Sequence, residues 1–179
     1  MQLNKYVSTI TLLAVSGLVA VSSANAATAN GSFNVNLTIT SVCAVVASPT
    51  TQDINFGSHA AGTASATIGE QSSAAAIAVT CSKNAPYAVN LTPSNSNTLG
   101  AGTMTGPGSD TVSYQLTQAA AGDAWGNTAT LEAAGNGVSG IGAGLAASAN
   151  THTVFATVTS TTDVQPGDYS DTVNVAVIY

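Results

Sequence analysis

Apolar and polar residues alternate with a period of two along much of the chain. The pattern is clearest in two segments, 33–40 and 173–179. From residue 33 to residue 40, large apolar side chains alternate with asparagine and threonine, so an extended backbone there has one apolar and one polar face. The apolar positions are Phe33, Val35, Leu37 and Ile39. The final segment repeats this pattern, with Val173, Val175, Val177 and Tyr179 on one face.

Short segments rich in Val, Ile, Thr and Tyr lie between these two ends, and turn signals such as Gly106-Pro107-Gly108 and Pro166-Gly167-Asp168 separate them. The pattern predicts an all-β protein, and many short strands at this spacing are typical of a β-sandwich. The further strands expected are Val42–Val46, Asp53–Phe56, Ala75–Cys81, Tyr87–Leu91, Thr111–Thr117, Thr128–Glu132, Thr151–Val158 and Tyr169–Tyr179.

The stretch from Pro93 to Asn150 has a different texture, because Gly, Ala, Ser and Asn dominate it. It is interpreted as long surface loops between a few strands, since neither flank offers enough apolar residues for a separate core. Its alanine-rich pieces, 119–121 and 143–149, favour at most a helical turn.

The first 26 residues have the pattern of a secretory signal peptide. Lys5 precedes an apolar run from Ile10 to Val21, and Ala24-Asn25-Ala26 forms an A-x-A cleavage site. The run is shorter than the roughly 20 residues that a membrane span needs. We therefore expect residues 1–26 to be removed and the rest of the chain to be exported and soluble.

Charged residues make up 6% of the chain, which has 2 basic and 8 acidic residues. After loss of the signal peptide, Lys83 is the only lysine or arginine left. A protein with so few cations cannot neutralise phosphates, which excludes nucleic acid as a partner.

Two cysteines are present, Cys43 and Cys81. In an oxidising compartment an isolated pair is most simply a disulfide, and no further Cys or His stands at a spacing that would favour a metal site. In the chain-entropy account of disulfides, closing a loop of this length stabilises the fold by about 4 kcal/mol.

Catalytic signatures are lacking. The histidines, His59 and His152, are not part of a nucleophile motif, and His152 is interpreted as a solvent-facing or hydrogen-bonded strand residue. Trp125 is expected to pack over the end of the sandwich, with a ligand platform as the alternative. Asp168 and Asp171 are interpreted as a turn cap and a solvated side chain because they lack the ligand spacing of a calcium loop. No catalytic residue, metal or cofactor is predicted.

Several segments taken together resemble the spore coat protein U domain family, which includes shaft subunits of Csu-type, or archaic, chaperone-usher pili. The similar segments follow one another in the order of that family and span nearly all of residues 27–179. They are Asp53-Ile54-Asn55-Phe56-Gly57, Val79-Thr80-Cys81-Ser82, Pro86-Tyr87, Val89-Asn90-Leu91, Tyr114-Gln115-Leu116, Trp125-Gly126-Asn127, and Gly167-Asp168-Tyr169-Ser170-Asp171-Thr172-Val173 continuing to Tyr179.

This resemblance implies an incomplete immunoglobulin-like sandwich that a neighbouring subunit completes with its N-terminal strand. It divides the chain into a signal peptide at 1–26, a donor-strand extension at 27–40 and a pilin domain at 41–179. The donor residues are then Phe33, Val35, Leu37 and Ile39. The implied edge strand of the groove, which would pair with the chaperone, carries Val173, Val175, Val177 and Tyr179.

The implied partners are identical subunits, a periplasmic chaperone, an outer-membrane usher and a minor or tip pilin, and the implied location is a pilus on the cell surface that serves adhesion and biofilm formation. Two alternatives remain from the sequence. One is a coat or matrix protein, or a soluble binding module whose N-terminal strand completes its own sandwich. The other is an exported enzyme, which a cluster of His152 with an acid would favour.

Overall fold

The structure is a computed structural model that describes residues 27–47 and 52–179. The predicted signal peptide, 1–26, lies outside these residues. Contacts divide the chain into two units, Met1–Thr38 and Ile39–Tyr179. The described part of the first unit is extended and has no assigned secondary structure.

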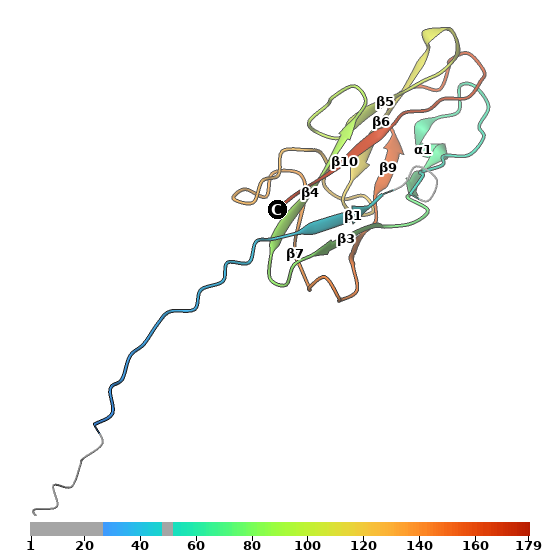
Figure 1. Ribbon diagram of the computed structural model, residues 1–179. Coiled ribbons are helices and arrows are strands. Elements are labelled where there is room, and N and C mark those ends of the chain that lie inside the picture. Colours follow the sequence, from blue (N-terminus) through green and yellow to red (C-terminus); the bar gives the residue numbers. More distant parts are fainter. Residues whose placement is uncertain (1–26, 48–51) are drawn as a thin grey trace, which may run out of the picture. The chain divides into compact units, whose positions relative to one another are not determined.

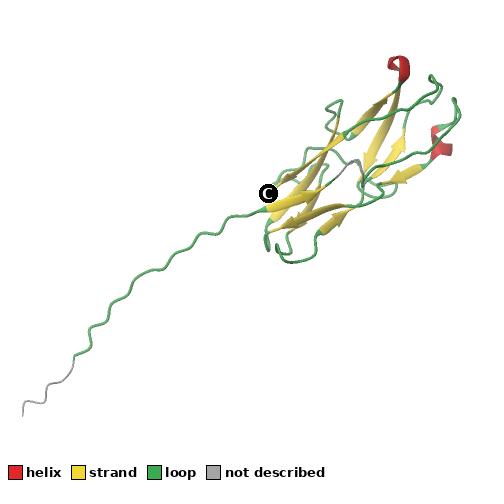
Figure 2. Cartoon of the chain, turned by 45° about the vertical axis from the view of Figure 1, so that its right-hand side comes forward, coloured by secondary structure: helices red, strands yellow, loops and turns green. Residues whose placement is uncertain are grey.

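The second unit consists almost entirely of short strands, so the predicted all-β fold is confirmed (Figure 2). A four-residue helix, α1 (Ser65–Ile68), and a single 3-10 turn, η1 (Pro107–Ser109), are the exceptions among the described residues. The strands are β1 (Cys43–Val46), β2 (Glu70–Ser72), β3 (Ile77–Cys81), β4 (Pro86–Pro93), β5 (Ala101–Thr105), β6 (Thr111–Thr117), β7 (Val138–Ile141), β8 (Asn150–His152), β9 (Phe155–Val158) and β10 (Val173–Ile178).

These strands form three sheets, and all the pairings within them are antiparallel (Figure 1). Their strand orders are β1-β3-β8, β10-β4-β7 and β2-β9-β6-β5. The predicted disulfide is present: Cys43 and Cys81 stand directly opposite each other in the β1–β3 pair and their sulfurs are bonded. The disulfide therefore fixes the start of β1 to the end of β3.

One main core lies between the three sheets. Ile77 and Val79 of β3, Val89 of β4 and Leu116 of β6 are buried in it. Trp125 is fully buried, and its indole N–H donates to the carbonyl oxygen of Val89 at 2.9 Å. Trp125 is therefore a packing residue and not a ligand platform, and its ring lies within the main core.

Several predicted strands match the structure closely, and Thr111–Thr117 has the bounds of β6. Two do not form. Asp53–Phe56 has no assigned strand, because the one backbone bond found there joins Ala74 N–H to Asp53 O and no ladder follows. Thr128–Glu132 is a loop in which Thr130 N–H donates to Ala133 O, so a local bond replaces a sheet partner.

The predicted strand Thr151–Val158 divides into β8 and β9, which belong to different sheets. Val154 lies at the crossing, where its N–H donates to the Ser73 hydroxyl at 3.2 Å and its carbonyl accepts from Ser73 N–H at 2.7 Å. A period of two continues through such a crossing, so the pattern alone cannot reveal it. The alanine-rich pieces 119–121 and 143–149 form turns and no helix.

Two strands that the sequence pattern misses contain glycines opposite tyrosines. Gly102 of β5 pairs with Tyr114 of β6, and Gly140 of β7 pairs with Tyr87 of β4. Each tyrosine ring occupies the space that a side chain on the opposite glycine would need. Because glycine contributes no apolar side chain, the alternation disappears from β5 and β7 although the strands are present. Within the described residues, no helix is long and apolar enough to cross a membrane.

Candidate functional site

The second unit contains a long groove with a volume of about 1100 Å³. One wall is formed by the end of β1 and residues 52–61, and the other by residues 162–172 and the first half of β10. The floor is mainly apolar and comes from β3, β4, β6 and β9. Its residues include Ile77, Leu91, Val112, Leu116, Val154, Ala156 and Val158, all of which belong to the buried core. These floor side chains are only 1–6% exposed, so the groove lies directly over the core of the domain.

The strands beside the groove are edge strands. Among the described residues, β10 pairs only with β4 and β1 pairs only with β3, so each presents one side of its backbone without a strand partner there. Unpaired edge strands accept an additional strand through main-chain hydrogen bonds. An extended segment lying in this groove would therefore gain both apolar contacts below it and backbone bonds beside it.

β10 has the alternation that the sequence predicts, over a shorter range. Val173, Val175 and Val177 are half-buried and pack against the main core. The strand ends at Ile178, so Tyr179 lies one residue beyond it and is 51% exposed. The segment 169–172 is not part of β10, because Ser170 instead makes an isolated bridge to Thr105 of β5. The chain thus crosses from one sheet to another just before β10.

A polar pair lies among the groove residues where this crossing occurs. The Tyr114 hydroxyl donates to Asp171 Oδ2 at 2.7 Å, and Thr172 N–H donates to Asp171 Oδ1 at 2.7 Å. The interpretation of Asp171 as a solvated side chain is wrong, because it is half-buried and joins β6 to the entry of β10. In the sequence, Tyr114 and Asp171 each stand within a predicted strand and a family motif, and no local signal indicates that they form a pair.

Electrostatics reinforce this pair. Burial acts to raise the pKa of Asp171, but hydrogen bonds from Ser94, Tyr114 and the backbone of Thr172 and Thr103 outweigh it and leave that pKa lowered. Burial raises the pKa of Tyr114 far above its ordinary value, and the hydrogen bond to Asp171 and the charge of that carboxylate raise it further. Tyr114 therefore remains a neutral donor and Asp171 a charged acceptor.

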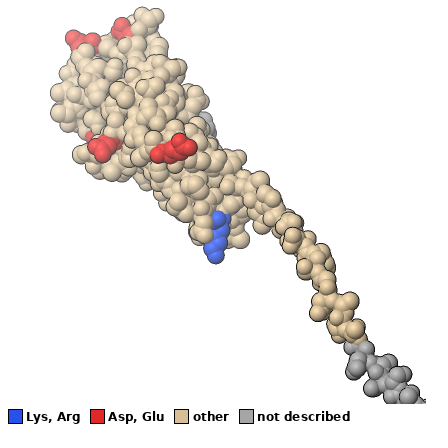
Figure 3. Space-filling model, turned by 90° about the vertical axis from the view of Figure 1, so that its left-hand side faces the viewer, with Lys and Arg blue, Asp and Glu red and all other residues tan. Residues whose placement is uncertain are grey.

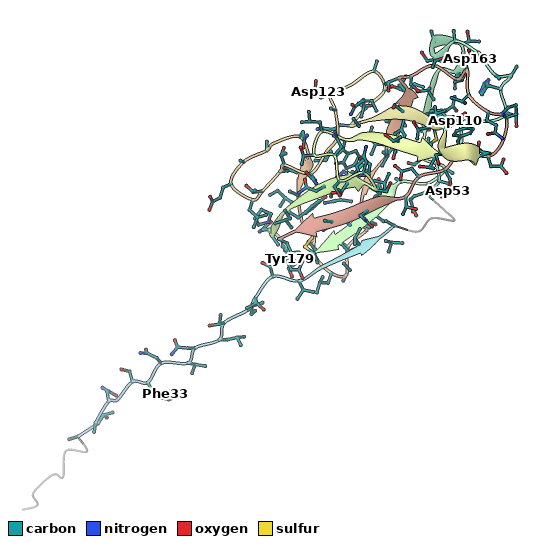
Figure 4. The ribbon with its side chains drawn as sticks, turned by 90° about the horizontal axis from the view of Figure 1, so that it is seen from above. Phe33, Asp53, Asp110, Asp123, Asp163 and Tyr179 are labelled. Atoms are coloured by element: carbon teal, nitrogen blue, oxygen red, sulfur yellow. A yellow bond between two sulfur atoms is a disulfide. The ribbon has the colours of Figure 1, made fainter. Side chains whose placement is uncertain are left out.

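The predicted donor residues are all exposed. Phe33, Val35, Leu37 and Ile39 are between 83% and 87% exposed, and they lie on an extended chain (Figure 4). Four large apolar side chains in water represent a considerable free-energy cost, since burying each would be worth about 1.5–3 kcal/mol. Exposed apolar surface of this extent is typical of an interaction site.

His152, whose clustering with an acid would favour an enzyme, lies against two aromatic side chains. His152 is hydrogen-bonded, with Nε2 at 3.0 Å from the Tyr87 hydroxyl, and its ring packs edge-on against Tyr87 and Trp125. Burial lowers the pKa of His152, which favours the neutral form. Within the described part of the chain, no group of three His, Cys, Asp or Glu residues is placed to hold a metal ion.

The comparisons with known proteins agree with this architecture. A solved structure with a similar fold is the crystal structure of the CsuC-CsuE chaperone-tip adhesion subunit pre-assembly complex from archaic chaperone-usher Csu pili of Acinetobacter baumannii. The similarity has a TM-score of 0.50 at 24% sequence identity, and it covers 79% of this chain and 40% of the matched chain. Comparison with curated proteins gives no match. The family model of the Spore Coat Protein U domain matches residues 29–176, and this chain therefore belongs to that family.

Proposed function

We propose that this protein is the subunit of a chaperone-usher pilus and that it polymerises by donor-strand exchange. As a member of a coat-protein family, it is a structural protein and not an enzyme. The apolar residues of 27–40 from one subunit enter the groove of the next, between β1 and β10. The observation that carries the proposal is the groove itself, which lies over the apolar core between two strands whose outer edges have no strand partner among the described residues.

The energetics of this exchange are favourable. Burying Phe33, Val35, Leu37 and Ile39 in a neighbour would contribute roughly 6–12 kcal/mol before the cost of ordering the segment. That range is similar to the whole stability of a typical domain, about 5–15 kcal/mol. A slip of one residue would turn the polar face inward, so the alternation also fixes which residues enter.

The same groove explains why partners are needed before assembly. An empty apolar groove beside an unpaired strand edge promotes aggregation. A periplasmic chaperone that lends a temporary strand to β10 would prevent this, with Val173, Val175, Val177 and Tyr179 along the edge that it covers. An outer-membrane usher would then exchange that strand for the 27–40 segment of the incoming subunit, and a minor or tip pilin would end the fibre. The product is an extracellular fibre suited to adhesion and biofilm formation.

The donor role is tested with subunits purified as chaperone complexes and then allowed to exchange strands. Deletion of residues 27–40 should leave chaperone binding intact and abolish entry into another subunit. Leu37→Asn should have the same effect, because it places an amide in the apolar groove. Asn36→Ser is the matched control on the polar face and should assemble normally. Electron microscopy and gel analysis of subunit complexes measure the result.

Normal fibres from the deletion variant would contradict the proposal, since no other segment is assigned the donor role. Equal assembly by Leu37→Asn and Asn36→Ser would contradict it as well, because the two faces would then be equivalent.

A further inference from the structure

The register of the strands places Lys83 and the start of β10, which we call the mouth of the groove, at opposite ends of the domain. Lys83 lies in the turn between β3 and β4. β10 runs antiparallel to β4, with Ile178 opposite Ala88 and Val173 opposite Pro93. The end of β10 is thus near Lys83, whereas the segment that enters β10 lies about 20 Å away, at the distal end of β4.

Carboxylates gather at that distal end. Asp53 and Asp168 are exposed and line the groove there. Asp110 is close to the same wall, because its Oδ2 accepts from Gln165 N–H at 2.7 Å. Figure 4 shows Asp53, Asp110 and Asp163 on the side of the domain away from Tyr179. In Figure 3 the basic and acidic side chains occupy separate places on a surface that is otherwise uncharged.

Lys83 is tied to the segment that leads into β1. Ser82 N–H donates to Val42 O at 2.9 Å, and Val42 N–H donates to the Ser82 hydroxyl at 3.0 Å. Lys83 is exposed, and within the described residues it forms no ion pair in its own subunit. The one cation among residues 27–179 therefore stands beside the place where the 27–40 segment joins the domain.

These positions distinguish two directions of strand insertion. If the donor strand ran parallel to β10, the body of the donor subunit would meet the Lys83 end of the acceptor, and like charges would face each other. If it runs antiparallel, Lys83 of the donor meets the carboxylates at the mouth of the acceptor groove. Opposite charges attract and like charges repel across such an interface, which selects the second direction.

We propose that Lys83 is a specificity-determining residue that docks against Asp53 and Asp168 of a second copy of this chain and orients the incoming subunit. The inference rests on the proposed function and names a contact outside the strand itself. Antiparallel pairing with Ile39 opposite Val173 also places Leu37 opposite Val175 and Val35 opposite Val177. All the paired apolar side chains then lie on the same face of the extended sheet.

The distances allow this contact. Four residue steps separate Ile39 from Cys43, and an extended chain spans at most about 14 Å over them. In the stated register Ile39 of the donor lies opposite Val173, the first residue of β10, so Val42 of the donor lies just beyond the start of the acceptor's β10. Because Ser82 is bonded to Val42, Lys83 of the donor is brought to the same end of the acceptor groove, which Asp53 and Asp168 line.

The test measures the rate at which purified chaperone-bound subunits form subunit–subunit complexes at low salt. Lys83→Glu should slow this rate about fivefold or more, because it replaces attraction by repulsion at the mouth of the groove. The double variant Asp53→Lys with Asp168→Lys should be slowed similarly. The triple variant, which exchanges both signs, should return to within about twofold of the wild type. Asp123→Lys is the control for a charge change elsewhere and should leave the rate unchanged.

Salt provides an independent measurement. At 1 M salt the screening length falls to about 3 Å, so the difference between wild type and Lys83→Glu should largely disappear. The inference is overturned if Lys83→Glu exchanges as fast as the wild type, or if the triple variant is no faster than Lys83→Glu. In both cases the proposed function stands, because the wild type still exchanges strands. Failure of the wild type to form any subunit–subunit complex would contradict the proposed function and this inference together.

Discussion

Among single residues, Asp171 and Tyr114 are the polar pair on which the shape of the groove depends. The hydrogen bond between them joins β6, in the floor, to the segment that enters β10, in the wall. A hydrogen bond to a charged group contributes more than one between neutral groups, about 1.5–3 kcal/mol when it is buried, and solvent screening reduces the contribution of this part-buried bond. The pair therefore holds the wall in position while the groove beside it is empty.

This contribution depends on pH with a definite sign. The pKa of Asp171 in the folded protein lies below its ordinary value of 3.8. Its stabilisation is therefore complete above about pH 4 and is lost as the pH falls through the lowered pKa. We expect Asp171→Asn to lower the free energy of unfolding at pH 7 by about 1–2 kcal/mol and to reduce the further loss of stability toward pH 2.

Denaturant titrations at pH 7 and at pH 2–4 measure both effects. Asp163→Asn, at an exposed loop position, is the control and should retain the wild-type profile. Tyr114→Phe should reproduce the loss at pH 7, since it removes the donor and keeps the ring. An acid profile of Asp171→Asn identical to that of the wild type would show that this carboxylate does not carry the dependence.

At the level of strands, the tyrosine–glycine pairs connect β5 to β6 and β7 to β4. The Tyr114 ring lies where a side chain at Gly102 would be, and the Tyr87 ring does the same at Gly140. In each case the tyrosine ring covers the backbone of the opposite strand. The ring fills the space that the glycine leaves, so the pair together occupies about the volume of two medium-sized side chains. Either glycine therefore tolerates no larger residue while its tyrosine is present.

We expect Gly102→Ala to destabilise the protein by about 1–3 kcal/mol, because the new methyl group would overlap the Tyr114 ring. In a Tyr114→Ala background the same change should cost little, since the ring is gone. A double-mutant cycle by thermal or chemical unfolding measures the coupling between the two positions. If Gly102→Ala were equally costly in both backgrounds, backbone conformation and not the ring would be the reason for glycine there.

The strands differ in how well their sequences predict them, and the reason lies in what each strand packs against. β6 and β10 show their alternation in the sequence because one face of each contacts the core. β5 and β7 are hidden by their glycines, whose packing partners are tyrosines on neighbouring strands. Asp53–Phe56 alternates as a strand does, yet it lines the groove and has no ladder. A sequence pattern reports which residues face apolar surroundings and not which backbone supplies the hydrogen bonds.

The groove itself was only partly predictable. The sequence predicts the alternation of apolar and polar residues in two segments, 33–39 and 173–177. The crossing at Ser170 and the Tyr114–Asp171 bond depend on contacts between residues 57 or more positions apart. The opposite wall depends on β1–β3 pairs that are 32 to 38 positions apart. A period along the chain cannot encode either kind of contact. The sequence likewise does not show that Lys83 and the carboxylates near the start of β10 lie at opposite ends of the domain, because this follows from the register of β10 on β4.

For the molecule as a whole, the disulfide lies where a fibre would transmit load. In the proposed assembly, tension on the 27–40 segment enters each domain at Cys43, the first residue of β1. β1 is a four-residue edge strand held on one side by β3, so hydrogen bonds alone would give it little resistance to peeling. The Cys43–Cys81 bond passes the load directly to β3, which is flanked by strands on both sides.

We therefore expect the disulfide to contribute more to mechanical than to thermal stability. Replacing both cysteines by serine should lower the free energy of unfolding by about 2–4 kcal/mol, in the normal range for such loops. Under force applied through the N-terminal segment, the same variant should release β1 at a markedly lower force than the wild type, because the first strand to bear the load is no longer cross-linked. Pulling wild-type subunits with and without a reductant measures the same effect without a substitution. Equal rupture forces in the oxidised and reduced proteins would mean that load enters the domain elsewhere, and would also weaken the case for residues 27–40 as the link between subunits.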